Sequence, residues 1–159
     1  MHPDGSGLEQ LTTGPSYDDQ AALSPDGRTL AFVSTRDGGT ANIWLLDLAR
    51  GRHSNLTQNT GGNFRPSWSP DGEWIAFSSD RDTKPGRFTP SWELLQSTAI
   101  YIVRRDGSGL RRLTKLGGYY GSPQWSRDGR RIVAYESNPR GSAVSGESDC
   151  ALLMQPIAA

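Results

Sequence analysis

The stretch Ser67–Phe77 reads Ser-Trp-Ser-Pro-Asp-Gly-Glu-Trp-Ile-Ala-Phe, and closely similar stretches occur at two other places in the chain. The earlier copy, Ala22–Phe32, reads Ala-Leu-Ser-Pro-Asp-Gly-Arg-Thr-Leu-Ala-Phe. The later copy, Gln124–Ala134, reads Gln-Trp-Ser-Arg-Asp-Gly-Arg-Arg-Ile-Val-Ala. Because one pattern in three copies indicates structurally equivalent units, we expect a repeat architecture.

A Leu-Thr pair follows the same spacing as this block. It occurs at Leu11-Thr12, Leu56-Thr57 and Leu113-Thr114, so that the first interval is 45 residues and the second is 57. The serine of the repeated block moves by the same two intervals. Two markers that lengthen together define a repeat of about 45 residues with an insertion in its second copy, and such units bury a shared core by stacking.

Each repeat is predicted to form four antiparallel strands, and the second copy shows this most clearly. Its first strand is expected at Pro66–Ser69, followed by a tight turn in which proline presets φ for the second turn position and Asp and Gly suit the later positions. Strands rich in β-branched and aromatic residues are expected at Trp74–Ser79 and Ile100–Val103, and a fourth at Leu110–Thr114. A four-stranded meander of this length is typical of a propeller blade.

The strand prediction also assigns side chains to faces of the blade. Ile75 and Phe77 should share one face, with Ala76 and Ser78 on the other, because successive residues of a strand point to opposite sides. The one candidate for a helical turn is Ser91–Gln96, inside the insertion.

We therefore predict an all-β fold, a partial β-propeller of about three four-stranded blades. Leu8–Thr12 should be the fourth strand of a blade, and Ala151–Gln155 should be a third strand. The predicted units are 1–12 as the last strand of a preceding blade, 13–57 as a blade, 58–114 as a blade with an insertion at 83–98, and 115–159 as an incomplete blade.

Composition limits the classes of function. The chain has 159 residues, and 17 basic residues balance 17 acidic ones, so that it has no general field for nucleic acid. No apolar run approaches the roughly 20 residues that span a membrane, and the start has no signal-peptide pattern. A single cysteine rules out an internal disulfide, and with two histidines neither a metal site nor a cofactor is predicted.

The repeat resembles the TolB-like, WD40-like (PD40) β-propeller family. The first copy departs from the family pattern with Leu23 in place of tryptophan, and the third with Arg127 in place of proline. The second copy carries most of the resemblance, at Trp68–Gly72, Ile75–Phe77, Ser79–Asp82, Ile100–Ile102, Asp106-Gly107 and Leu113-Thr114.

This resemblance implies a ring of about six blades, which three blades cannot close. Either the rest of a parent chain or a second copy of this chain would supply the remaining blades. The resemblance also implies a periplasmic or other extracytoplasmic setting.

Strand parity places the binding surface. The turns after the first and third strands lie on one face of the disc and are short, whereas the other loops are long and lie on the opposite face. Binding residues are usually carried by long loops on a rigid scaffold, and arginine and aromatic residues are enriched at protein contacts. The candidate binding residues on this long-loop face are Tyr17, Phe64, Arg65, Asp80, Arg81, Asp82, Arg87, Phe88, Trp92, Tyr119 and Tyr120.

Most of these candidate residues also have a purely structural interpretation. The stretch Asp80-Arg81-Asp82 could bind a cation, or its arginine could pair with a carboxylate of a neighbouring blade. Phe88 and Trp92 could pack the insertion onto the disc, and Tyr17, Phe64 and Tyr119 could pack between blades.

The leading hypothesis is a non-catalytic module that binds a protein or peptide through the long-loop face. The alternative is an accessory, gating propeller of a serine peptidase of the prolyl oligopeptidase type. No Gly-x-Ser-x-Gly elbow occurs in the chain, so that no catalytic residue is predicted. A propeller lyase is disfavoured because it would need several histidines facing the channel, and His2 and His53 are both predicted near outer strands.

Overall fold

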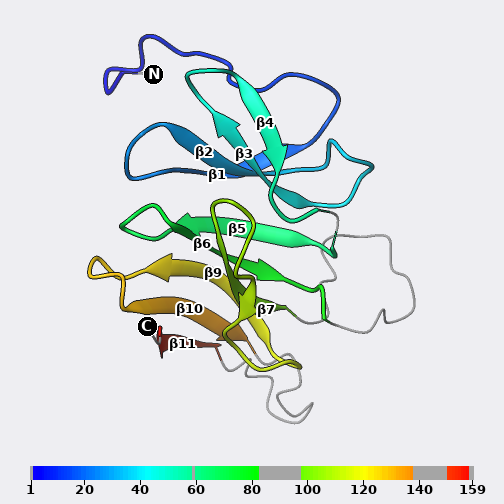
Figure 1. Cartoon of the computed structure of the whole chain (residues 1–159), viewed down its shortest axis with the longest axis vertical. Coiled ribbons are helices and arrows are strands. Elements are labelled where there is room, and N and C mark those ends of the chain that lie inside the picture. Colours follow the sequence, from blue (N-terminus) through cyan, green and yellow to red (C-terminus); the bar gives the residue numbers. More distant parts are fainter. Residues whose placement is uncertain (1, 59, 83–97, 138–149, 158–159) are drawn as a thin grey trace.

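The computed structural model describes residues 2–58, 60–82, 98–137 and 150–157. The strands within these ranges form three antiparallel sheets that are stacked along the long axis of the molecule (Figure 1). The first sheet has the order β1-β2-β3-β4, the second β5-β6-β7-β8, and in the third β10 lies between β9 and β11. Each sheet is therefore a meander, and the all-β fold predicted from the repeat is confirmed.

The strand bounds follow the repeat. They are β1 Asp18–Leu23, β2 Thr29–Ser34, β3 Asn42–Asp47 and β4 Arg52–Asn55; β5 Asn63–Trp68, β6 Trp74–Ser79, β7 Ala99–Arg104 and β8 Arg111–Arg112; and β9 Tyr119–Trp125, β10 Arg131–Ser137 and β11 Cys150–Pro156. We call the three sheets blades 1, 2 and 3.

Most strand predictions are confirmed, and two fourth strands differ. The second-strand prediction in blade 2 coincides with β6, and β11 contains the predicted Ala151–Gln155. The fourth strand of blade 2 is shorter than predicted, because only Arg111 and Arg112 pair with β7. Leu8–Thr12 is not a strand in the described structure: an outermost strand needs the third strand of its own blade as a partner, and no described residue supplies one. The predicted helical turn at Ser91–Gln96 lies outside the described residues.

The repeated turn explains why serine and aspartate recur in it. In blade 2 the Ser69 hydroxyl donates a hydrogen bond to Asp71 over 2.5 Å, and its oxygen accepts one from the backbone N–H of Trp74 over 2.9 Å. Gly72 completes the turn at a φ of +73°, where a side chain would be strained. The same serine–aspartate bond closes the equivalent turns of blades 1 and 3.

The Leu-Thr marker ties the chain after the fourth strand to the third strand. The Thr57 hydroxyl oxygen accepts a hydrogen bond from the backbone N–H of Ile43 over 3.0 Å, and Thr114 does the same for Ile100 over 2.9 Å. The preceding residues Leu56 and Leu113 pack against the apolar clusters between the blades. The pair therefore satisfies a backbone donor and fills core space at the same place in both blades.

The apolar core lies between the blades, and blade 2 contributes to it with both faces. Ile75 and Phe77 pack into the cluster shared with blade 1, while Ala76 packs into the cluster shared with blade 3, as the strand alternation predicts. Tryptophans in the first strands bind one blade to the next: the indole N–H of Trp68 donates to the Ala22 carbonyl over 3.0 Å, and that of Trp125 to the Ser67 carbonyl over 3.1 Å.

The first strand of each blade lies on the inner side, nearest the central axis about which the blades are arranged. β5 packs against both β1 and β9, whereas β4 and β8 pack mainly against the third strand of their own blade. This arrangement is the radial one of a propeller, with the first strands inside and the fourth outside.

The two end faces of the stack differ in exposure within the described structure. Leu152 on β11 is 80% exposed, whereas Ile100, at the equivalent place on β7, is 1% exposed because blade 3 covers it. At the other end, blade 1 carries a separate apolar cluster of Phe32, Trp44 and Leu46. Leu152 thus presents an uncovered apolar surface of the kind that packs against another blade inside the stack, whereas Phe32, Trp44 and Leu46 of blade 1 are buried at 2%, 8% and 3% exposure.

Candidate functional site

Three residues of the innermost strands share a backbone conformation that side chains rarely adopt. Gln20, Arg65 and Ser122 have φ values of 53°, 55° and 49°, and they occupy the same place in blades 1, 2 and 3. The strand register shifts at each of these places. Such bulges redirect side chains, and left-handed residues other than glycine cluster at functional sites.

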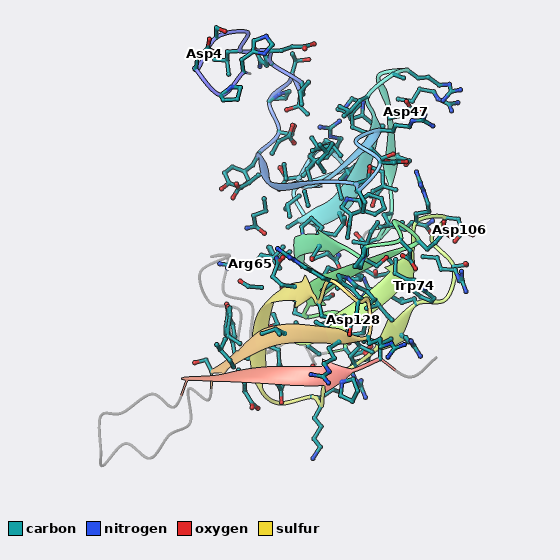
Figure 2. All side chains as sticks on the ribbon, turned by 90° about the vertical axis from the view of Figure 1, so that its left-hand side faces the viewer. Asp4, Asp47, Arg65, Trp74, Asp106 and Asp128 are labelled. Atoms are coloured by element: carbon teal, nitrogen blue, oxygen red, sulfur yellow. The ribbon has the colours of Figure 1, made fainter. Side chains whose placement is uncertain are left out.

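The same three residues are connected across the blades. The backbone N–H of Arg65 donates a hydrogen bond to the Gln20 side-chain oxygen over 2.7 Å, and the Arg65 guanidinium donates to the Ser122 hydroxyl. We call these three residues the axial row. Arg65 is exposed, and within the described part of the chain it forms no ion pair. Figure 2 shows Arg65 on the side of the stack opposite Asp47, which ends the third strand of blade 1, and Asp106, which lies in the turn after the third strand of blade 2.

Two predicted tyrosines occupy equivalent places beside the axial row. Tyr17 is 62% exposed, and its hydroxyl donates to Asp19 over 3.0 Å, a bond that raises the pKa of the tyrosine. Tyr119 stacks on Tyr135 with ring centroids 6.1 Å apart, and burial raises its pKa. Phe64 directly precedes Arg65 and is half-buried. The structure thus brings Tyr17, Phe64, Arg65 and Tyr119 to the starts of the inner strands.

Tyr120 has a different environment from its neighbour Tyr119. It is 6% exposed and belongs to the apolar cluster between blades 2 and 3. Its hydroxyl donates to Glu136 over 2.7 Å, and this bond, with burial, raises its pKa. The structure therefore places this candidate in the core, because strand alternation turns it away from the surface that Tyr119 faces.

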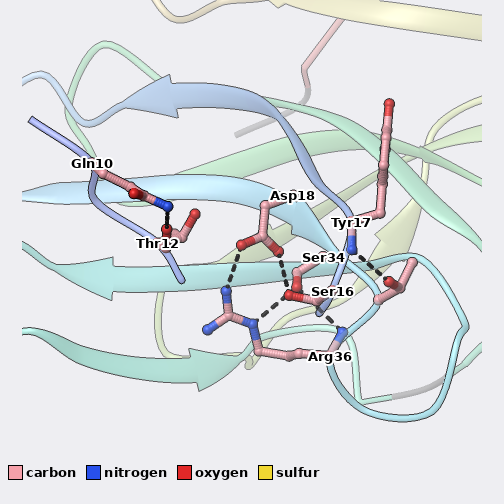
Figure 3. A network of polar contacts seen from close by, with 8 residues as sticks. Gln10, Thr12, Ser16, Tyr17, Asp18, Ser34 and Arg36 are labelled. Atoms are coloured by element: carbon pink, nitrogen blue, oxygen red, sulfur yellow. Dashed lines mark hydrogen bonds and ion pairs between the residues drawn. The ribbon is translucent and has the colours of Figure 1, made fainter. Parts of the chain in front are cut away.

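The arginines of the repeated loop are clamped inside their own blades. Arg36 pairs with Asp18 over 3.0 Å (Figure 3), and its guanidinium lies 5.0 Å from the Phe32 ring centroid and 5.1 Å from that of Trp44. Arg81 repeats this arrangement over Phe77 and Tyr101 and donates to Asn63 over 2.7 Å.

The prediction that these arginines pair with a neighbouring blade is wrong. Each arginine is the second residue after the second strand, so that the aromatic rings and the polar partner within reach belong to its own sheet. The interaction with two ring faces holds each side chain there.

The carboxylates on either side of Arg81 also have internal partners. Asp80 accepts a hydrogen bond from the Gly62 backbone N–H over 2.7 Å. Asp82 accepts one from the Tyr101 hydroxyl over 2.6 Å and pairs with Arg112 over 3.1 Å. Burial, followed by the bond to Asp82, raises the pKa of Tyr101 to about 12. These aspartates fix the loop, and among the described residues no group of three His, Cys, Asp or Glu side chains could hold a metal ion.

Two members of the axial row were not predicted. Gln20 and Ser122 share the repeat spacing with Arg65, but the three side chains differ in chemistry, and only the backbone conformation makes them equivalent. A comparison of equivalent places across the three copies could have found them. The predicted residues Arg87, Phe88 and Trp92 lie outside the described residues. Among the described residues, no helix is long and apolar enough to cross a membrane.

The family model for the PD40 TolB β-propeller domain matches residues 8–140. The chain belongs to this family. A TolB homolog of Chlorobium luteolum is 37% identical to this chain over 133 residues. The aligned region covers 82% of this chain and 26% of the relative. An uncharacterized peptidase of Bacillus subtilis, YuxL, is 30% identical over 79% of this chain and 22% of the relative. The chain therefore spans about a quarter of the length of these two relatives.

A solved structure of a TolB protein has a similar fold. The putative TolB of Agrobacterium tumefaciens superimposes with a TM-score of 0.63 at 24% identity, covering 92% of this chain and 53% of the other. At this level of identity the similarity establishes the propeller fold.

Proposed function

We propose that this propeller segment is a non-catalytic module that binds a protein or peptide through its long-loop face. The axial row is the observation that carries the proposal. It provides three left-handed inner-strand residues at equivalent places, joined by hydrogen bonds, with an exposed guanidinium that has no described carboxylate partner. Backbone strain of this kind persists where the surrounding structure holds a site in place.

The chemistry of this surface favours a peptide that carries a carboxylate. Arg65 offers a planar set of donors that suits a carboxylate, and its contact with the Ser122 hydroxyl holds the guanidinium in place. The exposed ring of Tyr17 and the half-buried ring of Phe64 belong to residues at the starts of the same inner strands. Arginine and aromatic residues together are typical of the energetically important centre of a protein contact.

Peptide display on the whole 159-residue chain tests this proposal. Peptides enriched from a random dodecapeptide library should be rich in acidic residues, and Arg65→Gln should weaken their binding by about tenfold, the loss expected for one charge-assisted hydrogen bond. Arg52→Gln removes an exposed arginine from the outer strand β4 and should leave binding unchanged. Enriched peptides that bind Arg65→Gln as tightly as the original chain would contradict the proposal.

A second candidate function is an accessory propeller of a serine peptidase, and the similarity to the Bacillus subtilis peptidase YuxL favours it. In that case the gene that encodes this chain should also encode a hydrolase domain with a Gly-x-Ser-x-Gly elbow. Sequencing the genomic region on both sides tests this. A complete gene that encodes propeller blades alone would exclude the peptidase.

A further inference from the structure

A cavity of about 360 Å³ lies between blades 2 and 3, beside the short turns and away from the axial row. Its walls include two tryptophans, three arginines and two isoleucines: Trp74, Trp125, Arg104, Arg111, Arg127, Ile102 and Ile157. A volume of this size is in the range of small-molecule sites. In Figure 2, Trp74 and Asp128 lie close together at this place, and Arg65 lies on the opposite side of the stack.

The seam between blades 1 and 2 shows why the cavity exists. There Arg105, from blade 2, fills the equivalent space: its guanidinium donates to the Thr29 hydroxyl over 3.2 Å and lies 5.8 Å from the Trp68 ring centroid. The residue of blade 3 equivalent to Arg105 is Ile157. Its backbone N–H donates to the Arg130 carbonyl as that of Arg105 donates to Glu73. The shorter, uncharged side chain leaves the second seam open.

The walls of the two seams differ in charge as well. Trp74 replaces Thr29, Arg104 replaces Asp47 and Arg111 replaces Ser54 at equivalent positions of the strand ladders. In the third turn Arg127 also replaces the proline that both other copies have. The first seam thus combines a neutral and acidic wall with a cationic side chain from blade 2. The second combines a cationic wall with an unfilled cavity.

Aromatic stacking orders part of the cationic wall. The Arg104 guanidinium lies 4.5 Å from the Trp74 ring centroid, and that of Arg111 lies 5.7 Å from it. Asp71 and Asp128 also line the cavity, but each accepts a serine hydroxyl and a backbone N–H of its own turn. Three arginines against two such carboxylates leave a net positive charge.

From this charge reversal we propose that the cavity between blades 2 and 3 binds a carboxylate joined to an aromatic or other apolar body. The carboxylate pairs with the arginine side of the cavity, and the apolar body packs against Trp125 and Ile157. Such a group can belong to a free small acid or to an acidic residue beside an aromatic one in a peptide. This site is independent of the axial row.

Titration of the 159-residue chain with 3-phenylpropionate, followed through its indole N–H NMR signals, tests the proposal. The Trp74 and Trp125 signals should shift, whereas the Trp68 signal, from the filled seam, should not. The matched amide 3-phenylpropionamide should bind about tenfold more weakly, since it lacks the charge. N-acetyl-Phe-Glu amide provides the peptide source, and the tighter of the two acids identifies which source the cavity prefers.

Two variants decide the outcome. Arg104→Ser should weaken binding of the acids by about tenfold, while Arg52→Ser, on the outer strand of blade 1, should not. Ile157→Arg restores the filling side chain of the first seam and should abolish the shifts, with the Trp44 and Trp68 signals reporting that the chain is still folded. Equal binding of acid and amide, shifts at Trp68, or no binding of either acid would overturn the proposal.

Discussion

At the scale of single residues, the repeated turn is held by one serine whose hydroxyl both donates and accepts a hydrogen bond. The Ser69 hydroxyl is buried at 2% exposure and satisfies the Asp71 carboxylate and the Trp74 backbone N–H. A sequence motif of this kind could be recognised as a turn, since Pro, Asp and Gly each have a known role there. The double role of the serine could not be predicted, because it depends on where the next strand begins.

We expect Ser69→Ala to lower the free energy of unfolding by about 1–3 kcal/mol, because it leaves the partly buried backbone N–H of Trp74 without its acceptor. Ser108→Ala provides the matched control, since the Ser108 hydroxyl donates to Asp106 in an exposed turn. Urea unfolding curves of both variants measure the difference. A loss for Ser108→Ala as large as that for Ser69→Ala would contradict the role assigned to burial.

The turn aspartates should make stability depend on acid. The hydrogen bond from Ser69 and then the Glu73 backbone N–H lower the pKa of Asp71 below its ordinary value of 3.8. A carboxyl group with a lowered folded-state pKa contributes stability above its unfolded pKa, and this stability is lost as the pH falls through the folded value.

We therefore expect Asp71→Asn to be less stable than the original chain at pH 7 and the difference to shrink below about pH 4. Unfolding free energies measured from pH 7 to pH 2 check this. A difference that stays constant with pH would show that the carboxylate charge does not contribute.

At the scale of strands, the repeat predicted the inner three strands of each blade better than the fourth. The second and third strands have long apolar runs that are buried on both faces, as at β6 and β7, and such runs identify a strand by themselves. The fourth strand is polar and outermost, so that its pairing depends on its partner. This is why β8 is short and Leu8–Thr12 is not a strand in the described structure.

The first strands also bind neighbouring blades through their tryptophans. Trp68→Phe keeps a ring but loses the hydrogen bond to the Ala22 carbonyl, so that we expect a loss of about 1 kcal/mol. Trp68→Ala also opens a cavity in the seam and should cost about 3–5 kcal/mol. Thermal or urea unfolding measures both. Equal losses for the two variants would contradict the packing role of the ring.

At the scale of the whole molecule, blade 2 is covered on both faces, and the β11 face of blade 3 is open within the described structure. The sequence predicted this from the number of blades, and Leu152 shows the open face directly. The candidate site was predicted only in part. Long loops and residue types led to Tyr17 and Arg65, but the axial row and the cavity between blades 2 and 3 depend on which residues of different copies meet across a seam.

We propose that further blades, from a parent chain or from a second copy, extend the stack and cover the exposed β11 face. The isolated 159-residue chain should then form dimers or larger species, because open sheet edges and apolar faces promote association. Leu152→Lys should reduce this association, whereas Leu116→Lys, an exposed loop substitution, should not. Sedimentation velocity over a range of concentrations measures the masses, and a stable monomer at all concentrations would refute the proposal.

The arginine clamps have a mechanical consequence. Arg36 and Arg81 secure their loops with partners from the same sheet, and the serine–aspartate turns close within one sheet as well. The polar links from one sheet to the next are limited to certain places along each seam, such as the tryptophan N–H groups, the axial row and the backbones of Asn63 and Thr98, whereas the strands inside a sheet are paired along their length. A force that pulls the stack apart lengthwise would therefore separate intact sheets from one another before it unravels any of them.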